Sequence, residues 1–81
     1  MTGMLASSKA GHDKKTVYVI IKEETEYVYL ADGRLKTLEK PKKKNKKHVQ
    51  IIKKNRRIDI SSVTNEEIKH IIKLYRDIKE V

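Results

Sequence analysis

The sequence predicts a mainly β protein, a small β-barrel of four to five short strands followed by one amphipathic α-helix. Three observations lead to this class. Short blocks rich in β-branched residues and tyrosine recur through the first fifty or so residues, separated by turn formers. In the last third of the chain the apolar period changes from two to three and four. The 81 residues make one domain, with a small core because folding at this size buries only about 60% of the unfolded surface.

Two strands are predicted before residue 22. Residues 4–8 are a short stretch of apolar and small side chains and predict the first strand. Residues 16–21, TVYVII, predict the second, because β-branched and aromatic residues are typical of strands. Val17 and Val19 would face one side of this strand and Tyr18 the other. Both faces are apolar, which indicates that a second layer covers part of the outside of the barrel.

The dipeptide Asp32-Gly33 predicts a β-hairpin. Residues 26–31 predict a third strand before it, and residues 34–38 a return strand after it. Asp-Gly suits the two-residue turn of such hairpins, which needs positive φ at both positions. This turn would place Leu30 opposite Leu35.

The end of the barrel is predicted from the residues that follow Pro41. The lysine-rich run after this proline predicts a crossing segment without full order, and HVQII at residues 48–52 predicts a further strand. The barrel would then span residues 1–54. Residues 55–64 form either a short edge strand or an extended linker, and the residues alone leave both open.

Residues 65–79 predict the helix. Thr64 to Glu67 form a capping box, in which Thr64 is the N-cap and Glu67 can reach back to its amide. Apolar residues then recur in one stripe: Ile68, Ile71, Ile72, Tyr75 and Ile78. A helix of about fifteen residues is marginal alone in water, so the stripe must dock. It either covers an open end of the barrel and enlarges the core, or binds a partner protein or a second copy.

The positive charge is concentrated in residues 40–57, which we call the basic strip. The strip holds ten Lys and Arg and no acid, whereas the remaining residues hold ten Lys and Arg against eleven acids. The formal net charge of +9 therefore lies in the strip. Such a cluster repels itself unless a polyanion relieves the repulsion. This favours a nucleic-acid partner over a solvated charge run without a partner.

Other functions find little support in the sequence. The chain has no Cys, so it has neither a disulfide nor a thiolate metal site, which suits a reducing compartment. No apolar run approaches the roughly 18 residues of a membrane span, and the amino terminus lacks the apolar segment of a signal peptide. We expect a soluble cytoplasmic protein. The three His are scattered without an orienting partner or a cleft, so we expect no enzyme, no metal, no other cofactor and no small-molecule substrate.

Three segments carry a resemblance to a known family. SKAGHDK, VYVII and YVYLADGRLKTLEKPKKKNKKH follow one another in this chain, and their order and spacing resemble the KOW-domain RNA-binding proteins of Gram-positive bacteria. That family is related to KOW-containing proteins of the archaeal and eukaryotic large ribosomal subunit. The resemblance covers residues 3–54 and implies an SH3-like barrel that binds structured RNA, with ribosomal RNA as the expected target. It implies that Gly11 is the KOW glycine, although relatives usually have a second glycine where this chain has Lys15.

The predicted RNA-binding residues are cations of the basic strip, of the loop around Gly11, and Arg34. Double-stranded RNA offers phosphates and 2′-hydroxyls more readily than base edges, so recognition would follow shape and backbone. Lysines would meet phosphates as compact charges, and arginines would bind them bidentately. The four Tyr are expected to pack in the core rather than to stack on bases. The predicted set is Lys9, His12, Lys14, Lys15, Arg34, Lys42, Lys43, Lys44, Lys46, Lys47, Lys53, Lys54, Arg56 and Arg57.

Two functions are consistent with the sequence. The first is an RNA-binding protein with a ribosome-associated or translation-accessory role. The second is a protein-interaction module of a transcription or translation complex that uses the helix, because SH3-like barrels also bind proteins and a fold does not determine a function.

Overall fold

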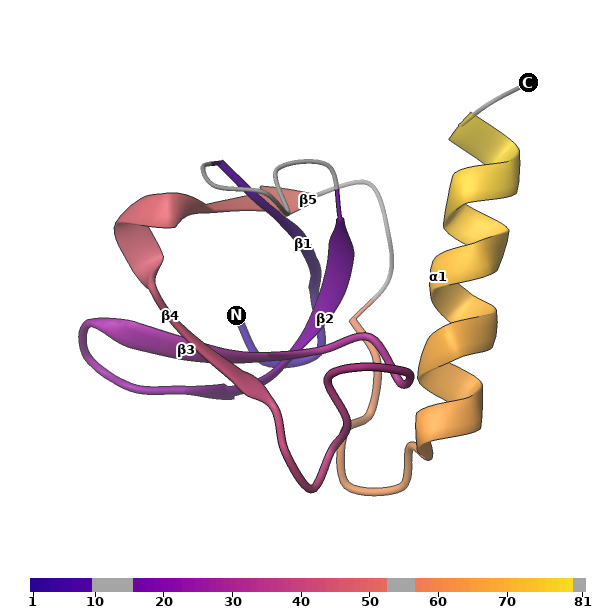
Figure 1. Cartoon of the computed structure of the whole chain (residues 1–81), viewed down its shortest axis with the longest axis horizontal. Helices are drawn as coiled ribbons and strands as arrows, with labels where there is room; N and C mark the ends of the chain where they lie inside the picture. Colours follow the sequence, from indigo (N-terminus) through magenta and orange to yellow (C-terminus); the bar gives the residue numbers. More distant parts are fainter. Residues whose placement is uncertain (10–15, 53–56, 80–81) are drawn as a thin grey trace.

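The computed structural model describes residues 1–9, 16–52 and 57–79. Within these residues the chain forms five strands, one short 3₁₀-helix and one α-helix (Figure 1). The elements are β1 (Leu5–Ser8), β2 (Val17–Glu23), β3 (Tyr27–Ala31), β4 (Lys42–Asn45), η1 (Lys46–His48), β5 (Val49–Ile52) and α1 (Asn65–Lys79). The predicted mainly β class with a carboxyl-terminal helix is confirmed.

All five strands belong to one antiparallel sheet with the order β4-β3-β2-β1-β5. The sheet curves into a ring, and η1 connects β4 to β5, the strands at the two ends of the order (Figure 1). This topology is consistent with the small SH3-like barrel that the sequence predicts.

The first four residues of β2 are buried, and their apolar side chains alternate between the two faces of the sheet. One face contributes to a cluster inside the barrel, made of Ala6, Tyr18, Ile20, Val28, Leu30 and Val49. The other face carries Val17 and Val19, as predicted, and belongs to a second cluster on the outside of the barrel.

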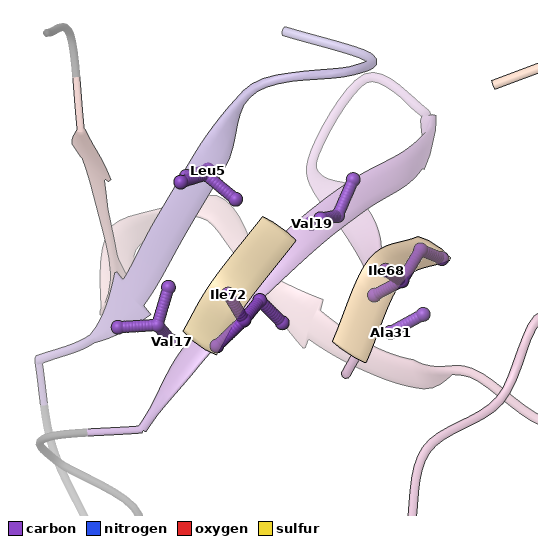
Figure 2. Packing of buried hydrophobic residues seen from close by; sticks show 6 residues of the cluster. All are labelled: Leu5, Val17, Val19, Ala31, Ile68 and Ile72. Atoms are coloured by element: carbon purple, nitrogen blue, oxygen red, sulfur yellow. The ribbon is translucent and has the colours of Figure 1, made fainter. Parts of the chain in front are cut away.

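The helix α1 covers this outer face. Ile68 and Ile72 are 0% and 4% exposed, and they complete the outer cluster, whose other members are Leu5, Val17, Val19 and Ala31 (Figure 2). The stripe therefore docks on the barrel of its own chain. It lies against the barrel wall (Figure 1) rather than across an open end, because the outer face is apolar and gains most from removal from water.

The helix begins where the capping box predicts. The Thr64 hydroxyl accepts a hydrogen bond from the Glu67 amide at 3.1 Å, and the Glu67 carboxylate accepts one from the Thr64 amide at 3.1 Å. These reciprocal bonds satisfy donors that the first turn of a helix leaves free.

The predicted return strand at residues 34–38 is wrong. Asp32 Oδ1 accepts hydrogen bonds from the amides of Arg34 and Lys36, both at 2.9 Å. The aspartate therefore closes a local loop instead of a two-residue hairpin turn. Leu35 is 82% exposed in this loop.

The loop is irregular because it is attached to the start of α1. Gly33 has a φ of 80°, and a Cβ there would lie 2.2 Å from the Asn65 carbonyl oxygen. Asn65 Oδ1 accepts a hydrogen bond from the Leu38 amide at 2.8 Å, and Asn65 Nδ2 donates to Glu39 Oε1 at 2.9 Å. These contacts direct the loop toward the helix and away from the edge of β3.

The basic strip supplies the fourth strand instead. In β4, Lys42 lies opposite Leu30, and Lys44 lies opposite Val28. The expected loosely ordered crossing is therefore a strand, which gives the backbone donors and acceptors of β3 a partner. Lysine has a low β-propensity, but such propensities depend strongly on context.

The link between β5 and α1 is irregular where it is described, with a turn at residues 60–62. Residues 57–64 contain no strand, which resolves the two alternatives in favour of a linker for this part. The Ile58 amide donates to the Gly3 carbonyl oxygen at 2.7 Å. Ile58, Ile60 and Val63 are half-buried and pack against the outer cluster.

The strand β2 has a bulge at Ile21. Ile20 pairs with Leu30 and Lys22 pairs with Tyr29, so Ile21 is an extra residue without a partner in the register. Ile21 packs against the outer cluster, whereas Lys22 lies over the ring of Tyr29. Two successive side chains thus lie on the outer face of the sheet.

The docking of α1 can be tested by conservative truncation. We expect Ile68→Val to lower the free energy of unfolding by about 1 kcal/mol, because it removes a fully buried methylene group. Leu74→Ala is the matched control on the same helix, since Leu74 is 47% exposed, and should change stability by less than about 0.5 kcal/mol. Urea unfolding followed by circular dichroism measures both. Equal losses in the two variants would contradict the described packing.

Candidate nucleic-acid interface

The strand β4 distributes the first lysines of the basic strip over two faces. Lys42 and Lys44 lie opposite core residues of β3 and are half-buried. Their apolar stems can lie along the barrel while their ammonium groups reach water. Lys43 lies opposite Tyr29 on the outer face and is exposed.

The strip continues through η1. Asn45 caps this helix, since its Oδ1 accepts a hydrogen bond from the Lys47 amide at 2.9 Å. Lys47 and His48 are exposed. Lys46 differs from them, because its Nζ lies 2.7 Å from Glu23 Oε2. Lys46 is therefore partly neutralised within the fold, while Lys47 presents its charge to solvent.

Glu23 lies between two cationic groups. The Lys46 ammonium donates to one carboxylate oxygen, and the Met1 amino group lies 3.0 Å from the other. The hydrogen bond from Lys46, followed by that from the amino terminus, holds the pKa of Glu23 below its ordinary value of 4.5. Glu23 therefore stays ionised and orients Lys46 at neutral pH.

The structure brings the first residue of the predicted loop set next to the strip. The Lys9 amide donates to the His48 carbonyl oxygen at 2.8 Å, and Lys9 is exposed. Lys9, the last described residue before residue 16, thus lies beside η1. The remaining predicted site residues of the loop and of the end of the strip lie outside the described residues: Gly11, His12, Lys14, Lys15, Lys53, Lys54 and Arg56.

Arg34 belongs to a different group of cations. It lines a hollow of about 240 Å³ between the Asp32-Gly33 loop and α1, together with Asp32, Lys69, Ile72, Lys73 and Arg76. The three helix cations share one face of α1 because they are spaced by four and three residues. These three cations lie outside the predicted RNA-binding set, although their spacing is visible in the sequence.

Arg57 lies beside the amino-terminal turn. It is exposed, and its Cγ would lie 2.7 Å from a Cβ built on Gly3. Among the predicted site residues, Lys9 thus lies next to the strip at η1. Arg34 lies next to the cations of α1.

The expectation that all four tyrosines are core residues holds only in part. Tyr18 is 4% exposed inside the barrel, but Tyr27 is 36% exposed. Tyr29 is half-buried and lies on the same face of β3 as Tyr27. The alternation in YVYL could have indicated this, because Val28 and Leu30 fill the inner face and leave both tyrosines outside.

Lysines lie over both outer tyrosines. Lys43 Nζ is 4.5 Å from the ring centroid of Tyr27, and Lys22 Nζ is 5.3 Å from that of Tyr29. Both distances are within the range of cation–π attraction. Basic and aromatic side chains thus share the outer face of β2, β3 and β4.

No protein-family model matches the chain, and no curated protein matches it at a significant level. Among residues 1–9, 16–52 and 57–79, no helix has the length and apolar character needed to cross a membrane. The same residues contain no group of three acidic or histidine side chains placed to hold a metal ion. What they do contain is ordered cations beside accessible aromatic rings, an arrangement that can bind a polyanion.

The Glu23 pair predicts a pH effect. Because the pKa of Glu23 is lowered in the fold, its contribution to stability is present above the unfolded pKa and is lost as the pH falls through the folded pKa. We expect Lys46→Met to raise the pKa of Glu23 toward its ordinary value, and Lys47→Met to leave it unchanged. Carboxyl-carbon NMR titration measures this pKa. An unchanged pKa in Lys46→Met would show that the pair does not form in solution.

Proposed function

We propose that this protein binds RNA through the basic strip and the loop after β1. The observation that carries the proposal is that residues 42–47 of the strip form regular secondary structure. Five lysines of residues 42–47 stand on β4 and η1 rather than on an irregular tail. Cations held at the edge of a sheet lose less freedom on meeting phosphates than cations of a disordered run, and they release the counterions of the RNA on contact.

The resemblance to KOW-domain proteins supports a particular target. It implies structured RNA, and we propose ribosomal RNA of the large subunit, with a cytoplasmic, ribosome-associated or translation-accessory role. The placement of Lys9 beside His48 supports a shared surface, because the loop that would carry the KOW glycine then starts at the strip.

The second candidate function is less well supported by the packing. A protein-interaction module built on α1 would need the apolar stripe of the helix to be accessible. Ile68 and Ile72 are buried against the barrel instead. Leu74 is 47% exposed, but one exposed leucine is ordinary on a protein surface.

Charge removal tests the role of the strip. We expect the logarithm of RNA affinity to fall with the logarithm of salt concentration with a slope of about −4 to −5, for about six neutralised phosphates. Lys43→Gln with Lys47→Gln should weaken binding at least tenfold at low salt and flatten the slope by about 1 to 2. Fluorescence anisotropy with a labelled RNA hairpin measures both.

The matched control is Lys73→Gln with Arg76→Gln, which removes the same charge from α1. We expect this pair to reduce affinity less than the strip pair does. An equal reduction would mean that only the net charge matters, and that the strip is not the interface.

Sedimentation tests the ribosomal target. We expect the tagged protein to migrate with the large ribosomal subunit in a sucrose gradient of lysate at low salt, and to leave it at roughly half-molar salt, because phosphate contacts weaken with ionic strength. A protein that stays at the top of the gradient under both conditions would exclude the ribosomal proposal.

A further inference from the structure

A row of three side chains crosses the outer face of the sheet. Lys22 of β2 lies opposite Tyr29 of β3, and Tyr29 lies opposite Lys43 of β4. Lys22 lies over the Tyr29 ring, and Lys43 reaches diagonally over the Tyr27 ring. Each tyrosine thus has an ammonium group next to it.

The ring of Tyr29 is also held from its polar end. Its hydroxyl donates to Glu24 Oε1 at 3.2 Å. This bond and the neighbouring lysine orient the ring before any ligand binds, which reduces the entropy lost on stacking. Tyr27, the more exposed of the two at 36%, offers the larger accessible ring surface.

A hollow lies next to this pair. Tyr27 is paired with Asn45, and Asn45 lines a hollow of about 220 Å³ together with Thr25, Glu26, Lys46 and Lys47. The side chains that line it carry cationic, amide, hydroxyl and carboxylate groups. Lys47 suits a phosphate because it is exposed, whereas Lys46 is paired with Glu23. Glu26 and Asn45 carry acceptors that suit the amino groups of a base or a ribose hydroxyl.

We propose that this face, which we call the stacking platform and define as Lys22, Tyr27, Tyr29, Lys43 and Asn45, binds unpaired nucleotides. Bases stack on Tyr27 and Tyr29, and the phosphates of the same strand contact Lys22, Lys43 and Lys47. The inference rests on the proposed RNA binding and adds a substrate class to it. The strip attracts any RNA, whereas the platform selects single-stranded or looped segments.

Unpaired strands fit the platform better than a duplex does. In an RNA helix the base faces are stacked on one another, so the protein meets only backbone and groove edges. Aromatic rings on a basic sheet surface offer stacking that only an exposed base can use, and such stacking depends little on sequence.

The first measurement uses the unaltered protein. The first probe is a mixed-sequence single-stranded RNA of about ten nucleotides, a length within common site sizes. The second is an abasic strand with the same number of phosphates. The third is an RNA hairpin whose only unpaired bases are those of its turn. The chain contains four Tyr and no Trp, so its fluorescence reports on tyrosines. We expect the base-bearing strand to quench this fluorescence, and the abasic strand to bind more weakly and to quench little.

The second measurement uses variants and labelled probes. Tyr27→Ala should weaken binding of the base-bearing strand about five- to one-hundred-fold, and should leave binding of the abasic strand within about twofold. Tyr27→Phe keeps the ring and should retain the affinity of the unaltered protein. Leu35→Ala is the matched control, because Leu35 is an exposed apolar residue outside the platform and should have no effect. Circular dichroism verifies that each variant is folded.

The outcomes separate the platform from the proposed function. Equal, salt-sensitive affinity of the unaltered protein for the base-bearing and abasic strands would overturn the platform and retain RNA binding through the strip. No binding to any of the probes at low salt would overturn the proposed function, and the platform with it. Loss of affinity in Tyr27→Phe equal to that in Tyr27→Ala would also overturn stacking, because the ring remains in that variant.

Discussion

The structure depends on the burial of one apolar surface, the outer face of β2. A barrel of about fifty residues has a small interior, and Val17 and Val19 point away from it. Ile68 and Ile72 of α1 cover them, so the helix acts as the second half of the core. The start of α1 must then lie against the barrel, where Asn65 binds the loop after β3. Because that loop cannot return along β3, the lysine run takes its place as β4.

The parts of the fold that depend on local chemistry could be predicted from the sequence. The two apolar faces of β2 follow from strict alternation, and the start of α1 follows from the reciprocal bonds of Thr64 and Glu67. The hairpin could not be predicted correctly, because Asp-Gly also suits a loop closed by the aspartate side chain. The contact between Gly33 and Asn65 decides between the two, and it joins residues that are far apart in the chain.

The candidate site was predictable in composition but not in geometry. The sequence localises the charge to the strip, yet it does not show that Lys46 is paired with Glu23 whereas Lys47 is exposed. Such differences arise from the register between strands, which follows from the tertiary position of β4. The same register places Tyr27 next to Lys43. Alternation in YVYL puts Tyr27 and Tyr29 on one face of β3, and the inner cluster of Val28 and Leu30 makes that face the outer one.

The bulge at Ile21 marks the border between the covered and the open halves of one sheet face. In a regular strand, Ile21 would lie opposite Tyr29, and Lys22 would turn toward the barrel interior opposite Val28. Because of the extra residue, the first half of β2 packs against α1 and the second half is exposed to solvent. The position of this border thus depends on the number of residues in β2 and not on the identity of one side chain. Deletion of Ile21 would leave Lys22 opposite Tyr29 in a regular ladder, but it would remove the side chain that joins this part of the strand to the outer cluster.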